Sequence, residues 1–179
     1  GVDDELVGAR VVALGYRPCG ACARCRVCCP TACSELELRG RSRGGGLAET
    51  VLLNANELVE VPTDVTLEDA ALTHHLGSAV RAVRRSPNRA GDRLAVIGAT
   101  PLGLAMTAVA VAAGHGKVAH VTDDPDGCAA TQRGAQAVAT PTDAARWDEL
   151  RAALGGHGPD VAVECTGNAG ARLAAIELV

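Results

Sequence analysis

The second half of the chain alternates short apolar runs with longer segments of helical length. We expect buried strands at 94–97, 117–122, 137–139 and 160–164. Helices are expected between and after them, at 101–113, 125–133, 142–154 and 169–179. This β-α-β-α order is typical of a doubly wound parallel sheet, so the predicted fold class is α/β.

The first half has a different pattern, with short extended segments separated by glycine. Strands are expected at 10–13, 47–54 and 56–61. The spacing from Thr66 to Asp69 resembles a capping box and predicts a helix to about Arg84, with a break near Gly77. A polar turn at 86–92 then marks the expected boundary between two domains, 1–86 and 87–179.

Composition narrows the possible functions. The formal net charge is −4, and the aromatic residues are one Tyr and one Trp with no Phe. A nucleic-acid binder would carry a basic excess or stacking aromatics, so we expect no nucleic-acid partner and a solvated face for the arginines of the first half. No apolar run is long enough to span a bilayer and no signal peptide is visible, which predicts a cytoplasmic protein without a membrane partner.

Six of the eight cysteines lie between Cys19 and Cys33. A secreted disulfide scaffold would distribute its cysteines along the chain, so the crowding favours a metal site. The spacing Cys19-x-x-Cys22-x-x-Cys25, with Cys33 after seven more residues, suits the four soft donors that zinc takes in a tetrahedron. On spacing alone, an iron–sulfur cluster, a redox-active thiol pair and a cysteine-rich loop without a ligand remain open.

The junction between the strand at 94–97 and the next helix has the features of a dinucleotide-binding turn. Gly98 and Gly103 occupy the first and last positions of G-x-G-x-x-G, and Thr100 stands in place of the middle glycine. An ordinary strand–helix turn remains the alternative. Asp123, or Thr122 one residue earlier, lies where a ribose-binding acid is expected; a carboxylate there would favour NAD(H) over NADP(H). A solvated residue in an acidic turn is the alternative for Asp123.

Several segments occur together in an order that resembles the zinc-dependent medium-chain alcohol dehydrogenases, including the sorbitol- and threonine-dehydrogenase-like enzymes. They are the Cys19–Cys33 array and the segments 45–49 (GGLAE), 61–72, 91–98 (GDRLAVIG) and 158–167 (GPDVAVECTG). The resemblance covers essentially the whole chain. It implies a partial GroES-like β-rich lobe followed by an incomplete Rossmann domain.

The resemblance also implies roles for individual residues. Four cysteines would hold a structural zinc ion: Cys19, Cys22, Cys25 and Cys33. Cys28 falls where the family usually has glycine, so Cys28 and Cys29 are taken as additional thiols rather than ligands. The cofactor-binding residues would be Gly98, Thr100, Pro101, Leu102, Gly103, Asp123, Thr166 and Gly167. His74 falls at the third ligand position of the family's catalytic zinc, but the other two ligands precede the cysteine lobe in the family and have no counterpart here.

The function implied is hydride transfer between a small-molecule alcohol or ketone and a nicotinamide cofactor, in a homo-oligomer. Because the catalytic-zinc ligands and the last strands of the cofactor domain have no counterpart, these residues are expected to be an internal fragment that is inactive alone. The alternative is a non-catalytic zinc-binding interaction module derived from the same family.

Overall fold

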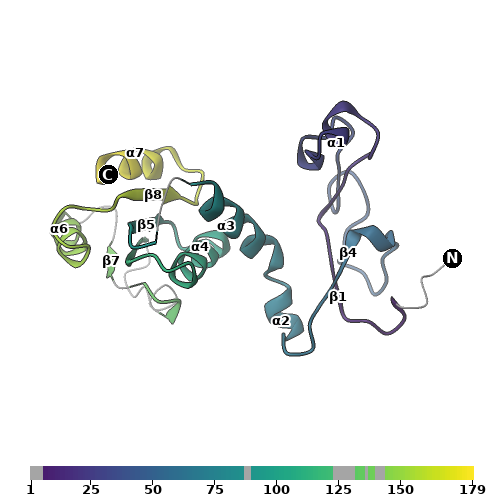
Figure 1. Cartoon of the computed structure of the whole chain (residues 1–179), viewed down its shortest axis with the longest axis horizontal. Helices are drawn as coiled ribbons and strands as arrows, with labels where there is room; N and C mark the ends of the chain where they lie inside the picture. The colour runs from purple at the N-terminus through teal and green to yellow at the C-terminus, as the bar shows by residue number, and fades with distance from the viewer. Residues whose placement is uncertain (1–5, 87–89, 123–131, 136, 140–143) are drawn as a thin grey trace. The chain divides into compact units, whose positions relative to one another are not determined.

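The computed structural model describes residues 6–86, 90–122, 132–135, 137–139 and 144–179. The chain divides into two compact units, Gly1–His74 and His75–Val179, which are described separately below (Figure 1). Within the described residues, no helix combines the length and the apolar character needed to cross a membrane.

Unit 1 is built on two short antiparallel strand pairs. Strand β1 (Val11–Ala13) pairs with β4 (Leu58–Glu60), and β2 (Tyr16–Arg17) pairs with β3 (Glu37–Leu38). The connections carry a short helix and two 3-10 turns: α1 (Ala23–Arg26), η2 (Pro30–Ala32) and η3 (Ala55–Glu57).

The strand predicted at 47–54 is wrong. The segment is irregular, and its apolar side chains Leu47 and Leu52 are exposed. An apolar segment forms a strand only where a neighbouring strand can satisfy its backbone groups, and no strand among the described residues pairs with this segment.

The helical region after Thr66 is split into α2 (Leu67–Ala70) and α3 (Thr73–Arg85). The predicted capping box is present: the Thr66 hydroxyl accepts from the Asp69 amide at 3.0 Å and donates to its carboxylate at 2.8 Å. The break predicted near Gly77 is wrong, because Gly77 lies inside α3. The interruption falls earlier, where the Thr73 hydroxyl donates to the carbonyl oxygen of Ala70 at 2.6 Å.

Unit 2 contains the predicted parallel sheet. Its strands are β5 (Arg93–Ile97), β6 (Lys117–Val121), β7 (Ala137–Ala139) and β8 (Val161–Glu164), in the spatial order β7-β6-β5-β8. The helices are α4 (Pro101–Ala112), α6 (Ala144–Ala153) and α7 (Ala169–Leu178). Most of the helix predicted at 125–133 lies outside the described residues.

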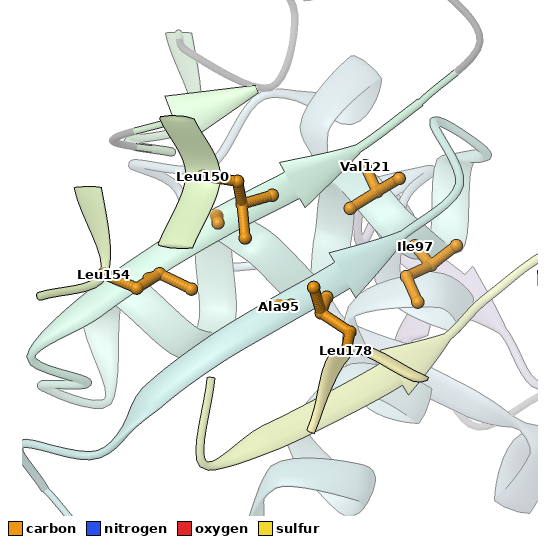
Figure 2. Close-up of a cluster of buried hydrophobic side chains, with 7 residues drawn as sticks. Ala95, Ile97, Val121, Leu150, Leu154 and Leu178 are labelled. Carbon is orange, nitrogen blue, oxygen red and sulfur yellow. The ribbon is translucent and has the colours of Figure 1, made fainter. Parts of the chain in front are cut away.

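The sheet has an apolar core on each face. Ala95 and Ile97 of β5 belong to a cluster with side chains of α6 and α7 (Figure 2). Leu94 and Val96, the alternate residues, belong to a second cluster with side chains of α3 and α4. Alternation along a strand sends successive side chains to opposite faces, so a nearly continuous apolar strand requires helices on both sides. Helix α3, which precedes the expected domain boundary, therefore packs with unit 2.

The strand order creates a crevice at one edge of the sheet. The chain runs outward from β5 to β6 and β7, and then returns to place β8 on the other side of β5. In open α/β sheets, ligands bind outside the carboxyl ends of the strands where the order reverses, which here is between β5 and β8.

A short series of buried hydrogen bonds joins β6 to the first turn of α4. His120 of β6 is fully buried, and its Nδ1 lies 3.0 Å from the hydroxyl of Thr107 on α4. Because that hydroxyl donates to the Gly103 carbonyl at 3.1 Å, its oxygen accepts a hydrogen bond from the protonated Nδ1 of His120. The other ring nitrogen, Nε2, has no hydrogen-bond partner among the described residues. Burial therefore lowers the pKa of His120 and keeps the ring neutral.

This arrangement predicts that unit 2 loses stability in acid. The pKa of His120 in the folded state lies below the unfolded value of about 6.5. The contribution of neutral His120 to the free energy of unfolding is thus fully present above about pH 6.5 and is lost as the pH falls through the folded pKa. Urea unfolding followed by fluorescence of the single Trp, Trp147 of α6, should show this loss, and His120→Leu should reduce it. The exposed His157 provides the control; if His157→Gln reduces the acid sensitivity as much, the assignment to His120 is wrong.

Candidate metal centre and nucleotide-binding crevice

The four predicted cysteines converge on one point. The Sγ atoms of Cys19, Cys22, Cys25 and Cys33 all lie within 4.8 Å of one another. Two of the separations are 3.6 Å, from Cys22 to Cys25, and 3.9 Å, from Cys22 to Cys33. Cys33 is buried, whereas Cys19 is exposed and the other two are half-buried.

These distances fit a single tetrahedral ion. Zn–S bonds of about 2.3 Å place the sulfurs of a tetrahedron about 3.8 Å apart. A disulfide needs about 2.05 Å, and all four cysteines are free thiols. An iron–sulfur cluster binds its thiolates through different iron atoms, so its ligand sulfurs would lie further apart than these. The donor set therefore fits one zinc ion.

Backbone amides surround the sulfurs as they do around bound thiolates. The amides of Ala21 and Cys22 donate to the Cys19 sulfur at 3.4 and 3.3 Å, and the Cys19 amide donates to the Cys33 sulfur at 3.3 Å. Backbone hydrogen bonds lower the pKa of the Cys22 thiol to about 5. Burial and the adjacent Cys22 sulfur raise the pKa of the Cys25 thiol to about 12. Four sulfurs this close cannot all ionise without a cation among them.

The turn that follows Cys25 has the geometry of a Schellman cap. The Cys28 amide donates to the Cys25 carbonyl at 3.1 Å, and the Cys29 amide donates to the Arg24 carbonyl at 2.9 Å. Cys28 itself has a φ of +58°, the left-handed conformation usually taken by glycine at this position. Cys28 and Cys29 are both exposed and are not members of the four-sulfur cluster.

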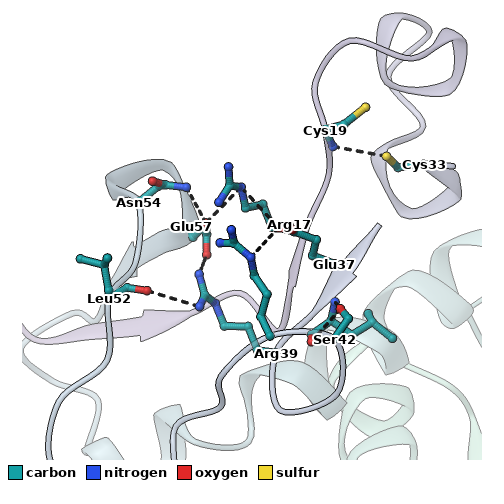
Figure 3. A network of polar contacts seen from close by, with 11 residues as sticks. Arg17, Cys19, Cys33, Glu37, Arg39, Ser42, Leu52, Asn54 and Glu57 are labelled. Carbon is teal, nitrogen blue, oxygen red and sulfur yellow. Dashed lines mark hydrogen bonds and ion pairs between the residues drawn. The ribbon is translucent and has the colours of Figure 1, made fainter. Parts of the chain in front are cut away.

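A polar network takes the place of an apolar core beside the cysteine lobe (Figure 3). Glu57 is 3% exposed and forms an ion pair with Arg39, which is 12% exposed. The Glu57 carboxylate also accepts a hydrogen bond from the side-chain amide of Asn54 at 2.8 Å. The hydrogen bond from Arg39 holds the pKa of Glu57 below its ordinary value despite burial. Arg43 pairs with Glu37 at 2.9 Å, and Arg17 lies within 4.0 Å of both acids. The expected solvated face is therefore wrong for Arg39, whereas Arg17 and Arg43 pair with acids while their side chains stay 39% and 42% exposed.

In unit 2, the turn after β5 is shaped by two glycines. Gly98 has a φ of +104°, and a Cβ there would lie 2.2 Å from a methyl carbon of Thr166. A Cβ on Gly103 would lie 1.9 Å from the Gly98 carbonyl oxygen. Such close packing brings the N-terminus of α4 against the end of β5, where backbone amides and the helix dipole favour a phosphate group.

Thr100 has a structural role in this turn. Its hydroxyl accepts from the Gly103 amide at 3.1 Å as the N-cap of α4, and donates to the Cys165 carbonyl at 3.0 Å. The hydroxyl of Thr100 therefore uses its only proton within the protein. Pro101 occupies the first turn of α4, where the absence of an N–H costs nothing.

The end of β8 is organised by Glu164, which sequence reasoning missed. Its carboxylate accepts from the amide and hydroxyl of Thr166 and from the Gly167 amide at 2.9 Å. Burial raises the pKa of Glu164, but these hydrogen bonds outweigh it and the net shift is downward. The signal available in the sequence was an acid directly before Cys165-Thr166-Gly167. In the structure, Gly167 has a φ of +77°, which a glycine adopts without strain.

A cavity of about 280 Å³ opens at this edge of the sheet. It is lined by Ile97, Gly98, Val121, Thr122, Thr166, Asn168, Gly170 and Ala171. The structure thus brings together Gly98, Thr166 and Thr122, the alternative to Asp123 at the ribose-binding position. Thr100, Pro101, Leu102, Gly103 and Gly167 shape the surrounding turns without lining the cavity.

Two predicted site residues remain, Asp123 and His74. Asp123 lies outside the described residues. His74 is exposed near the start of α3. Among the described residues, only the four cysteines form a group of potential metal ligands, and His74 is not part of it.

Known zinc-type dehydrogenases match the chain in sequence and in structure. YphC of Escherichia coli K12, a zinc-type alcohol dehydrogenase-like protein, is 29% identical over 174 residues, covering 95% of this chain and 49% of its own. The L-threonine 3-dehydrogenase of Chelativorans sp. BNC1 is 31% identical over 171 residues, with the same two coverages. A Sinorhizobium meliloti 1021 zinc-binding dehydrogenase solved with NADP has a TM-score of 0.87 at 27% identity, covering 96% of this chain and 51% of its own. No family model matches the chain.

The chain belongs to the zinc-type alcohol dehydrogenase family. Unit 1 corresponds to part of the GroES-like lobe and unit 2 to part of the Rossmann domain, which confirms the predicted fold class. The chain spans about half the length of the curated relatives it matches.

The tight contact at Gly103 yields a stability prediction for this family member. Gly103→Ala should lower the free energy of unfolding of unit 2 by about 3 kcal/mol, because the added carbon would meet backbone atoms that cannot rotate away. Gly77→Ala is the matched control: nothing lies within 4 Å of its added carbon, and alanine should stabilise α3 by about 0.5–1 kcal/mol. Urea unfolding monitored through Trp147 measures both; equal effects would contradict the packing argument.

The left-handed turn yields a second prediction. Cys28→Gly should stabilise the zinc-loaded lobe by about 1 kcal/mol, because glycine adopts this conformation without steric cost. The single Tyr of the chain, Tyr16 of β2, reports the unfolding of unit 1 by fluorescence. At Val27 the φ is −99°, so Val27→Gly should destabilise instead. A loss of stability in Cys28→Gly would be inconsistent with the turn as described.

Proposed function

We propose that this chain forms the structural-zinc lobe and part of the cofactor-binding domain of an oxidoreductase that transfers a hydride between a small-molecule alcohol or ketone and a nicotinamide dinucleotide. The observation that carries the proposal is the convergence of four free thiols at separations that suit one zinc ion. Membership of the zinc-type alcohol dehydrogenase family supports the same reading.

The zinc proposed at Cys19, Cys22, Cys25 and Cys33 has a structural role. Four protein ligands fill a tetrahedron, whereas a catalytic zinc keeps one position open for water or substrate. This ion would cross-link the segment from Cys19 to Cys33, and its free energy of binding would contribute to folding. Free thiolates persist in a reducing compartment, which supports a cytoplasmic location.

The crevice between β5 and β8 is proposed as the dinucleotide site. The pyrophosphate would lie at the N-terminus of α4, which the tight turn at Gly98 and the close packing of Gly103 hold against the end of β5. Thr166 and Gly167 would border the cofactor at the end of β8, positioned by the carboxylate of Glu164. The bound nicotinamide would supply the hydride acceptor or donor. We propose NAD(H) rather than NADP(H), and binding of both must be compared because the S. meliloti relative was solved with NADP.

We further propose that residues 1–179 alone are inactive and that the complete enzyme is a homo-oligomer. Among the described residues, the only group of three or more potential metal ligands is the four-cysteine cluster, and His74 is not part of it. An open zinc site needs about three protein ligands. The same observation favours the second candidate function, a non-catalytic zinc-binding module that uses this lobe for association.

Native mass spectrometry tests the zinc site directly. We expect one zinc ion per 18.1 kDa subunit, with NADH adding to the complex at the mass of one cofactor. Cys25→Ser should lose the zinc and unfold unit 1, seen by Tyr16, while Trp147 still reports a folded unit 2. Cys29→Ser removes a thiol outside the cluster and should keep the zinc.

Each outcome separates the candidates. A second zinc ion with chelator-sensitive, alcohol-dependent NADH formation would contradict the inactive assignment. Zinc with a defined oligomer but no binding of NADH or NADPH would favour the interaction module. Absence of zinc in a chain purified under reducing conditions would overturn the metal site.

A further inference from the structure

Two thiols of the cysteine lobe have no place in the proposed zinc site. Cys28 and Cys29 are both exposed free thiols, and both lie in the short loop between the ligands Cys25 and Cys33. The four ligand sulfurs already complete a tetrahedron, so neither thiol is needed for the metal. They are chemically accessible groups placed within a few residues of a zinc–thiolate centre.

The turn places Cys28 beside Cys25. The Cys28 amide donates to the Cys25 carbonyl at 3.1 Å, so the two residues stand three apart on one closed helical turn. The first and last residues of a turn closed by such a hydrogen bond have Cα atoms less than about 7 Å apart. A disulfide needs Cα atoms about 4.4–6.8 Å apart, so rotation of the side chains and a small shift of the turn would permit one. Cys28 takes the left-handed conformation, in which a side chain is strained, whereas glycine would satisfy the turn.

We propose that Cys28 and Cys29 form an oxidation site through which hydroperoxides release the zinc ion of this lobe. The inference rests on the proposed zinc site. An exposed thiolate, that of Cys28, attacks one oxygen of hydrogen peroxide, breaks the O–O bond and becomes a sulfenic acid as hydroxide leaves and is protonated to water. The Cys25 thiolate then attacks the sulfenic sulfur, forming the Cys25–Cys28 disulfide and releasing the second oxygen as water once protonated. Two thiols lose two electrons in total, and one peroxide becomes two waters.

This disulfide would remove one of the four zinc ligands. A site with three remaining thiolates holds the ion more weakly, and the lobe loses the cross-link on which its fold depends. Cys29 provides a second exposed thiol that peroxide can oxidise first. The Cys28 thiolate then attacks the sulfenic sulfur of Cys29 and water leaves; attack of Cys25 on the Cys28 sulfur forms the Cys25–Cys28 disulfide and releases Cys29 as a thiolate. Reduction of the disulfide by a low-molecular-weight thiol would restore the ligand set.

The test uses the zinc-loaded full chain treated with hydrogen peroxide. Zinc release is followed with a chromogenic chelator, and disulfides are mapped by peptide mass spectrometry. We expect release several-fold slower in Cys28→Ser/Cys29→Ser than in the unsubstituted chain, and a Cys25–Cys28 disulfide in the unsubstituted chain but not in this double variant. Cys28→Gly/Cys29→Ser repeats the measurement with a turn that glycine favours, so that slower release cannot be attributed to a distorted lobe. Cys165→Ala, which removes a half-buried thiol of unit 2, should release zinc at the unsubstituted rate.

Equal release rates in the double variants and the unsubstituted chain would overturn the proposal. A Cys28–Cys29 disulfide formed with the zinc retained would overturn it as well. The zinc content before peroxide is added distinguishes a failure of the zinc site from a failure of the oxidation site. In a chain that holds no zinc, the disulfide map still decides whether peroxide joins Cys28 to Cys25.

Discussion

Unit 1 buries very few of its apolar side chains. Among its described residues, only Cys33, Val61 and Ala70 are buried hydrophobics, whereas the sheet of unit 2 has an apolar cluster on each face. Small folds with so little apolar burial usually rely on disulfides or a metal ion for stability. The four-thiol cluster is in position to meet that need, because it joins Cys19 to Cys33 across the loop that carries α1 and η2.

The polar network at Glu57 lies in the unit that has so little apolar burial. A buried carboxylate is costly unless it is paired, and Glu57 is paired with Arg39 and hydrogen-bonded by Asn54. Its backbone carbonyl also accepts from the Leu14 amide at 2.7 Å, which ties the segment before β4 to the end of β1. Directional hydrogen bonds and metal coordination thus fix geometry in unit 1. In unit 2, non-directional apolar packing on both faces of the sheet does so.

This difference explains how much the sequence could predict. Strands β5, β6, β7 and β8 followed from short apolar runs, because a parallel strand covered on both faces has little choice of composition. The cysteine cluster followed from spacing, since two Cys-x-x-Cys turns place sulfurs around one point. The segment at 47–54 failed because an apolar pattern does not reveal whether a partner strand exists. The pairing of Arg39 with Glu57 and the buried link from His120 to Thr107 join residues far apart along the chain or on different elements, and composition alone treats such polar residues as solvated.

Thr100 shows how a departure from a motif can be compatible with its function. The middle glycine of G-x-G-x-x-G normally allows the backbone to approach a pyrophosphate, and a side chain here would be expected to obstruct it. The Thr100 side chain is instead directed into protein hydrogen bonds, accepting from Gly103 and donating to the Cys165 carbonyl beyond β8. The hydroxyl thereby connects the two strand ends that border the crevice. Any phosphate bound here would have to be held by backbone amides and the α4 dipole, with Thr100 fixing their position rather than contacting the ligand itself.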